Sequence, residues 1–168
     1  MAFDADPEVV AVSSQPFWLH WSAGGRERRH APDFFVRLRS GDAVVVDVRP
    51  DDRIEPADAE AFAVTERACA AVGWRYRRVG ELDGVLAANL RWLSGYRHSR
   101  CRQADRATAL CEAFARPREL LVGVRAVGDP VAVLPVLFHL LWTRELSTDL
   151  TAAVLGPRSL VSAGGDQR

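Results

Sequence analysis

Short β-branched and alternating apolar runs fill the first half of the chain and predict strands. The strongest is the valine run of residues 43–48, whose unbroken apolar character is typical of a central strand buried on both faces. Residues 74–79 alternate bulky and charged side chains, which predicts a strand with one exposed basic face. A turn at residues 22–27 predicts a hairpin that leads into residues 28–30. Turn residues separate the remaining predicted strands, which are residues 9–12, 17–21 and 33–38.

Helical spacing follows these strands. Pro56 opens a helix with acidic residues in its first turn, and Gly73 closes it. Residues 120–125 fit either a strand or a helix, and residues 144–150 and 160–161 could form a small hairpin. The order predicts an α/β fold with a small, mainly helical C-terminal region, whose helices and short hairpin permit a winged-helix-like appendage among other helical packings. The other predicted helices are residues 82–96, 104–115 and 134–142.

The length of 168 residues fits one domain, or one domain with a small appendage. A hydrophobic content of 48% and a charged content of 26% exclude gross disorder. We expect a folded domain over residues 1–103, an accessory region over 104–162 and a disordered tail over 163–168.

No secretory signal or membrane span is expected. The most apolar stretch, residues 130–142, is too short for a bilayer, which needs about 20 residues. The cysteines are odd in number and lack metal-type spacing, so we expect reduced thiols in the cytoplasm. Cys69 is expected to be a buried core residue and not a nucleophile. The cysteines are Cys69, Cys101 and Cys111.

Charge is unevenly spread although its sum is zero. All 22 basic residues are arginine, which excludes enzymes that need a lysine for a Schiff base or a Walker-type phosphate loop. Residues 1–66 carry 7 Arg against 13 acids, a net charge of −6. Residues 74–106 carry 8 Arg against 3 acids, a net charge of +5. An acidic front and a basic middle suit a metal site beside a phosphate-contacting face, and an ordinary solvated surface is the alternative.

Two acids are the candidate ligands of a metal ion. Asp33 follows a proline at the start of one predicted strand, and Asp47 lies at the end of the next. In adjacent antiparallel strands the two carboxylates come close together, and their repulsion favours a divalent cation such as Mg²⁺ or Mn²⁺. Arg49, two residues after Asp47, can stabilise a pentavalent phosphate electrostatically. Turn-capping acids at strand ends are the alternative interpretation.

A resemblance to a known family rests on longer strings. The Pro-Asp and Asp-Val-Arg pair resembles the PD-(D/E)xK nuclease signature. The strings around it resemble the TnsA-like endonuclease subunits of heteromeric transposases, in order over most of the chain. These strings are residues 14–19, 30–35, 44–50, 73–76, 89–93, 95–98 and 134–142.

The resemblance implies a restriction-endonuclease-like fold, a mixed sheet flanked by helices. It implies Mg²⁺- or Mn²⁺-dependent cleavage of one DNA strand at a transposon end, beside a DDE-type transposase subunit that cuts the other strand and an ATPase regulator. Asp33 and Asp47 would hold the metal, and Arg49 would take the place of the motif lysine as the third catalytic residue. The C-terminal region would contact DNA or the partner subunits.

Two departures from the family keep other functions open. Family members carry a helix before the first strand that supplies a catalytic Glu, and no such helix precedes Asp4 here. Arg49 keeps a positive charge but cannot act as a neutral base. A catalytically inactive or truncated homologue that binds DNA and transposase is therefore one alternative, and a stand-alone restriction or repair nuclease is another. A Glu-bearing helix encoded in frame upstream would favour the enzyme.

Further candidates come from histidines, tryptophans and arginines. His30 could touch a phosphate or a metal-bound water, with a surface strand histidine as the alternative, and His139 is expected in the core. The tryptophans are expected in the core, with stacking of one of them on bases as the alternative. They are Trp18, Trp21, Trp74, Trp92 and Trp142. A phosphate-contacting stripe could form from Arg75, Arg77, Arg78, Arg91, Arg97, Arg100 and Arg102.

Overall fold

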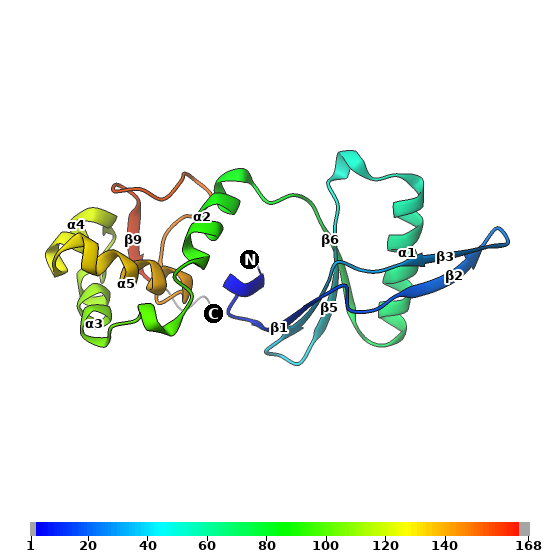
Figure 1. The fold of residues 1–168 in the computed structure, drawn as a ribbon, viewed down its shortest axis with the longest axis horizontal. Coiled ribbons are helices and arrows are strands. Elements are labelled where there is room, and N and C mark those ends of the chain that lie inside the picture. The colour runs from blue at the N-terminus through cyan, green and yellow to red at the C-terminus, as the bar shows by residue number, and fades with distance from the viewer. Residues whose placement is uncertain (1–2, 165–168) are drawn as a thin grey trace. The chain divides into compact units, whose positions relative to one another are not determined.

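The computed structural model describes residues 3–164, which fall into two compact units (Figure 1). The N-terminal unit is Asp6–Glu81. The C-terminal unit combines Met1–Ala5 with Leu82–Arg168, of which the structure describes residues 3–5 and 82–164. The boundary between the units therefore follows Glu81, whereas the sequence placed a domain boundary after residue 103.

A four-stranded mixed sheet organises the N-terminal unit. Its strand order is β1 (Val9–Ser14), β4 (Phe34–Leu38), β5 (Ala43–Val48) and β6 (Arg75–Val79). The first two pairings are antiparallel, and β5 pairs with β6 in parallel. This arrangement confirms the predicted mixed sheet and places β5 between two neighbours.

Burial of β5 matches the prediction from its valine run. Val45 and Val46 are 0% and 1% exposed, and only the last residue of the strand, Val48, reaches solvent. Helix α1 (Pro56–Ala71) connects β5 to β6, after a short 3-10 turn η2 (Asp51–Arg53). Helix α1 buries Cys69, as expected, and the described cysteines are all free thiols.

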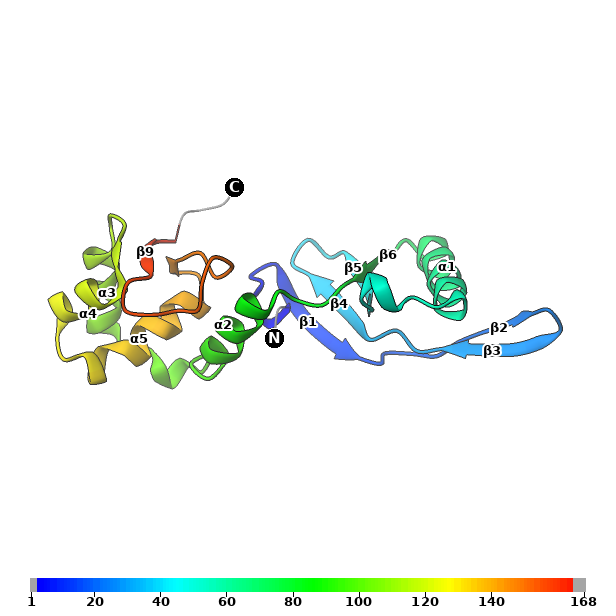
Figure 2. The ribbon, with the colours of Figure 1, turned by 90° about the horizontal axis from the view of Figure 1, so that it is seen from above.

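A separate hairpin rises from this unit. Strands β2 (Leu19–Ala23) and β3 (Arg26–His30) pair only with each other among the described strands, which confirms the predicted hairpin. Gly24 and Gly25 join them with φ angles of +58° and +73°, a conformation that glycine adopts without strain. The two views of the ribbon show the tip of the hairpin extending past α1 (Figures 1 and 2).

The C-terminal unit is mainly helical. It begins with η1 (Phe3–Ala5), and its helices are α2 (Gly84–Ser94), α3 (Ala104–Ala113), α4 (Leu120–Val127) and α5 (Pro130–Trp142), with a 3-10 turn η3 (Ser99–Cys101) between α2 and α3. Residues 120–127 are thus a helix. The predicted start of the last helix at residue 134 is wrong, because Pro130 occupies its first turn and the Asp129 side chain caps it through the Val131 N–H.

A small sheet completes this unit. Strand β9 (Leu160–Ala163) pairs with β8 (Leu146–Ser147), which confirms the predicted hairpin, and also with β7 (Arg118–Glu119), which the sequence did not predict. The winged-helix comparison stays a prediction. Ala163, the first residue of the predicted tail, ends β9, and residues 165–168 of that tail lie outside the described residues.

Helices α4 and α5 are the most apolar helices, but neither meets the length of a membrane span. Between residues 3 and 164, no single helix is long and apolar enough to cross a bilayer. The two helices together reach that length only as a pair bent by 120°.

Close packing of α4 on α3 leads to a test of the C-terminal core. A Cβ atom at Gly123 would lie 2.2 Å from the ring of Phe114, which is fully buried. We expect Gly123→Ala to lower the free energy of unfolding by about 1–3 kcal/mol through overpacking. Chemical denaturation followed by circular dichroism measures this.

Gly84→Ala is the matched control, because a Cβ at the start of α2 meets no atom within 4 Å. It should leave the free energy of unfolding unchanged or raise it by less than about 1 kcal/mol. Equal stabilities of the two variants would contradict the packing described.

Candidate active site

The two predicted acids lie side by side at one end of the central strands. Asp33 directly precedes β4, and Asp47 is the fifth residue of β5. The backbone N–H of Asp33 donates to Oδ1 of Asp47 at 3.3 Å, and the N–H of Val48 donates to Oδ2 of Asp33 at 2.7 Å. The antiparallel pairing of β4 with β5 produces this proximity, as the sequence predicted.

Asp47 is buried and fully hydrogen-bonded. Asp47 is 1% exposed to solvent. Nε2 of His30 lies 3.0 Å from Oδ1 and 3.1 Å from Oδ2, and the hydroxyl of Tyr76 donates to Oδ2 at 2.8 Å. Burying an ionised carboxylate without partners costs free energy. The contacts with His30 and Tyr76 offset this cost for Asp47.

The partners of Asp47 have shifted pKa values. The hydrogen bond to Asp47 raises the pKa of His30 above its ordinary value of 6.5; burial opposes this, while the charges of Asp47, Asp33 and Asp58 add to it. Burial, and then the hydrogen bond to Asp47, raise the pKa of Tyr76 far above its usual range. Tyr76 is therefore a neutral hydrogen-bond donor, and His30 favours the charged form that compensates Asp47.

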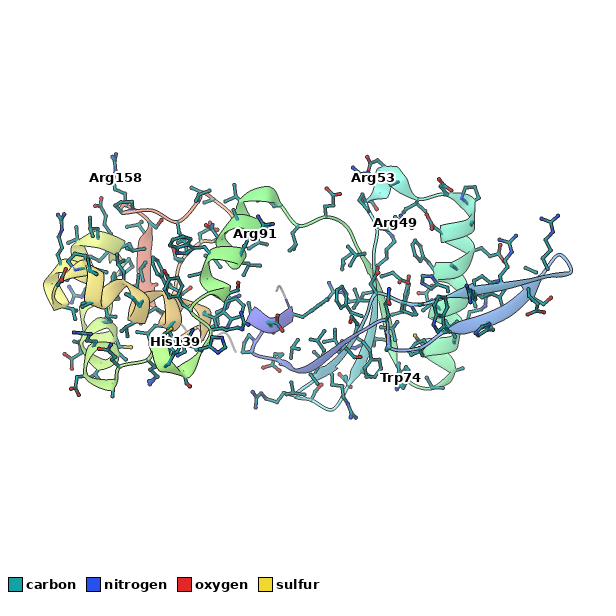
Figure 3. The ribbon with its side chains drawn as sticks, in the orientation of Figure 1. Arg49, Arg53, Trp74, Arg91, His139 and Arg158 are labelled. Atoms are coloured by element: carbon teal, nitrogen blue, oxygen red, sulfur yellow. The ribbon has the colours of Figure 1, made fainter. Side chains whose placement is uncertain are left out.

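Arg49 lies just past the end of β5 and is held at both its backbone and its side chain. Its N–H donates to the carbonyl of Val79 at 2.9 Å, and its own carbonyl accepts from Arg78 at 2.8 Å. Its guanidinium donates to Oδ1 of Asp58 at 3.1 Å, with the side chain 46% exposed. Figure 3 shows Arg49 on the same side of the unit as η2, near Arg53.

Asp58 joins the site from the first turn of α1. It forms a capping box with Glu55, whose N–H it accepts at 3.2 Å, while its other oxygen binds Arg49. Asp58 and Tyr76 are the neighbours that sequence reasoning missed. The capping-box spacing of Glu55 and Asp58 was a signal for the first, and the interruption of a basic strand by Tyr76 was a weaker signal for the second.

Asp33 and Asp47 bring carboxylate oxygens, the ligands that Mg²⁺ prefers, to one place. Oδ1 of Asp33 accepts no hydrogen bond from the described residues, whereas both oxygens of Asp47 are engaged. Over residues 3–164, no group of three or more His, Cys, Asp or Glu side chains is arranged to hold a metal ion. Mg²⁺ is commonly held by one or two carboxylates with phosphate and water completing its shell, so this pair suits a site that phosphate completes.

The predicted basic stripe is divided between the two units. Arg75 and Arg77 are exposed on one face of β6, while Arg78 is on the opposite face and binds Asp51 as well as the Arg49 carbonyl. The other members belong to the C-terminal unit, namely Arg91, Arg97, Arg100 and Arg102. These four are exposed, and Arg102 forms an ion pair with Glu145 at 2.8 Å.

The prediction for His139 is confirmed, whereas the prediction for the tryptophans is mostly wrong. His139 is a core histidine, 4% exposed, with Nδ1 2.8 Å from the Tyr96 carbonyl. The prediction that the tryptophans form core is wrong for most of them. All five lie within the described residues; Trp142 alone is buried, and Trp18 and Trp92 are 57% and 55% exposed.

Comparison with known proteins supports the interpretation of the N-terminal unit. Residues 6–81 match a family model described as TnsA-like endonuclease N terminal. The match has the same bounds as the N-terminal unit and contains the whole cluster around Asp47. It confirms, for this unit, the resemblance found in the sequence strings. No curated protein matches the chain.

The raised pKa of His30 predicts a pH-dependent contribution to stability. A histidine whose folded pKa exceeds 6.5 stabilises the fold fully below pH 6.5, and this contribution is lost as pH rises through the folded pKa. We expect wild type to exceed His30→Gln most in free energy of unfolding below pH 6.5, with the difference shrinking at higher pH. Urea denaturation across a pH series measures it.

His20→Gln is the control, because His20 lies on the exposed face of β2. Its substitution should leave the free energy of unfolding unchanged. A difference between wild type and His30→Gln that grows with pH would contradict the charge pairing of His30 with Asp47.

Proposed function

We propose that this protein is the metal-dependent endonuclease subunit of a heteromeric transposase and cleaves one DNA strand at transposon ends. The observation that carries the proposal is the convergence of Asp33 and Asp47 inside a unit that matches the TnsA-like endonuclease N-terminal family. The family itself points to a transposase partner and a DNA substrate in general.

Each residue of the cluster has a distinct role in this proposal. Asp33 and Asp47 would hold Mg²⁺ or Mn²⁺, which when bound supplies charge neutralisation at the phosphodiester and an oriented water. Arg49 donates hydrogen bonds to phosphate oxygens and stabilises the negative charge that develops on them. It does not accept a proton from water, since a guanidinium stays charged.

His30 and Tyr76 are positioning residues. Both bind Asp47 and neither touches the substrate in this proposal. They fix the carboxylate between β3 and β6, so that its orientation is set before DNA arrives. Such outer partners of metal-binding side chains commonly change affinity or activity by about 10–100-fold.

The proposed partners follow from the family match. As the resemblance implies, the DDE-type transposase subunit would cut the other strand at the transposon end. An ATPase regulator would complete the assembly. The C-terminal unit, with exposed Arg91, Arg97 and Arg100, would contribute contacts to DNA or to these subunits.

A binding module without cleavage activity is the second candidate function. This candidate is favoured because the groups that would hold metal and phosphate are already paired within the protein. Both oxygens of Asp47 accept hydrogen bonds, and Arg49 is paired with Asp58. A module of this kind would retain the contacts to DNA and transposase and leave cutting to another subunit. A stand-alone restriction or repair nuclease, the third candidate, would cut DNA without any transposase.

Cleavage of transposon-end DNA tests the proposed site. With Mg²⁺ and the transposase subunit present, we expect Asp33→Asn and Asp47→Asn to lower the cleavage rate by at least about 100-fold, because each removes a charge that holds the metal. Denaturing gel electrophoresis of end-labelled strands measures the rate. Asp52→Asn is the matched control, since Asp52 is an exposed acid of η2 in the same unit, and it should cleave like wild type.

Three results would separate the candidates. Unchanged cleavage by both aspartate variants would refute the site. DNA binding without cleavage by wild type, with either Mg²⁺ or Mn²⁺ and with the transposase present, would establish the binding module. Cutting at full rate without transposase would establish the stand-alone nuclease.

Arg49 offers an independent prediction about phosphate. We expect Arg49→Ala to lower the cleavage rate by about 100-fold or more, as is usual when a donor to a charged transition state is removed. Arg49→Lys should lose less of the rate than Arg49→Ala, because the positive charge remains while the fixed orientation provided by Asp58 is lost. Arg53→Ala is the control, since Arg53 is exposed nearby and forms only a surface ion pair with Glu81 at 3.6 Å. Equal losses in Arg49→Ala and Arg53→Ala would contradict the assigned role.

A further inference from the structure

Helix α2 has one face in the core of the C-terminal unit and the other in solvent. Leu90 and Leu93 are 4% and 1% exposed, and Asn89 is buried beside them. The amide nitrogen of Asn89 donates to the carbonyl of Leu150 at 2.9 Å, and its oxygen accepts from the N–H of Leu155 at 2.9 Å. These contacts fix the helix from behind.

The solvent face of α2 carries an open groove of about 580 Å³. This α2 groove is lined by residues at helical spacing, namely Ala88, Arg91, Trp92, Gly95 and Tyr96. Trp92 is 55% exposed, and its neighbours along the stripe, Ala88 and Gly95, are too small to cover the indole. Because one helix and its end supply the whole lining, the groove presents an aromatic surface and not a cleft between two elements.

Two other aromatic rings hold Trp92 in place. Its ring centroid lies 6.0 Å from that of Tyr96 and 5.9 Å from that of Phe138 on α5, and the Tyr96 and Phe138 rings are 4.9 Å apart. The backbone of Tyr96 is fixed in turn, because its carbonyl lies 2.8 Å from Nδ1 of the buried His139. An indole that is already ordered loses little conformational freedom when a ligand stacks on it.

The segment that carries the groove is basic. Residues 84–103 include four arginines and no acid, the arginines being Arg91, Arg97, Arg100 and Arg102. Arg102 is paired with Glu145, and Arg97 lines a separate pocket together with Asp4. Arg91 lines the α2 groove itself, and Figure 3 shows it on α2. Over residues 3–164 its guanidinium has no hydrogen-bond or ion-pair partner, so it can bind an anion next to the indole.

We infer that the α2 groove binds an unpaired nucleotide of DNA, with the base stacked on Trp92 and a phosphate on Arg91. This inference rests on the proposed function only in taking DNA as the substrate. Stacking on an aromatic side chain needs an exposed base face, which bases inside a duplex do not offer. A peptide helix would need an extended apolar groove, whereas this one has a single exposed indole beside a cation. A nucleotide supplies both the planar ring and the negative charge that these two side chains match.

Binding of single-stranded DNA without metal tests the α2 groove separately from cleavage. The full chain is titrated against a fluorescein-labelled oligothymidylate of about 12 nucleotides in EDTA, and fluorescence anisotropy gives the affinity at several salt concentrations. Trp92→Ala should bind at least about fivefold more weakly, with an unchanged slope of log affinity against log salt, because stacking releases no counterions. Arg91→Ala should also bind more weakly, and its slope should fall by about 0.7, the value of one phosphate contact on a single strand.

Two further variants separate stacking from a loss of folding. Trp92→Phe should keep most of the affinity, because an aromatic face remains. Ala88→Leu leaves Trp92 in place and fills the groove, so it should weaken binding as Trp92→Ala does. A blunt duplex of the same length should bind wild type and Trp92→Ala equally.

Trp18→Ala and Arg125→Ala are the matched controls. Trp18 is 57% exposed in the N-terminal unit, and Arg125 is exposed on α4 without an ion pair in the described part of the chain. Both variants should bind the oligonucleotide like wild type. An equal loss in Trp18→Ala would show that the effect is not specific to the α2 groove and would overturn the inference.

Other results would overturn it as well. Wild-type affinity in both Trp92→Ala and Ala88→Leu would leave the groove to a protein partner, and equal losses for single strand and duplex would make it a duplex contact. The two proposals fail separately. If Asp33→Asn and Asp47→Asn cleave normally while Trp92→Ala loses single-stranded DNA, the active site is wrong and the α2 groove stands. If the aspartate variants lose cleavage and Trp92→Ala binds normally, the reverse holds.

Discussion

The buried carboxylate of Asp47 is the constraint on which the N-terminal unit depends. A carboxylate at 1% exposure in a central strand needs hydrogen-bond donors and a compensating charge, because neither water nor the valines around it supply them. The donors come from three elements, His30 at the end of β3, Tyr76 in β6 and the backbone before β4. The hairpin, the sheet and the entry to β4 therefore share one polar centre.

This centre sets the position of the proposed active site. Val48 and Arg49 follow Asp47 directly, so the chain passes from a buried carboxylate to an exposed guanidinium within two residues. The first turn of α1 supplies Asp58 at the same end of β5. Acids and an arginine are thus placed on strand and helix termini of a packed scaffold, where their positions are fixed more closely than on a free loop.

Local sequence patterns predicted the strands and helices and the proximity of Asp33 to Asp47. They did not predict contacts between segments that lie far apart in the chain. The valine run fixed β5 as central, and the short turn at residues 40–42 made its antiparallel pairing with β4 predictable. Tyr76 is 29 residues from Asp47, and no local pattern specifies that its hydroxyl reaches that carboxylate. The tryptophans were misjudged because hydrophobic size favours burial only on average, and Trp18 instead forms a platform for Arg29 at the surface.

Arginine at position 49 acquires a structural explanation from its contact with Asp58. A guanidinium carries five N–H donors in a planar fork, whereas an ammonium carries three on a flexible stem. One nitrogen of Arg49 binds Oδ1 of Asp58, whose other oxygen caps the start of α1. The remaining donors of the fork can then meet phosphate while the anchor to α1 persists. A lysine would have to divide one nitrogen between the two tasks. Under the proposed function, arginine would therefore give up proton transfer and gain a fixed orientation toward phosphate.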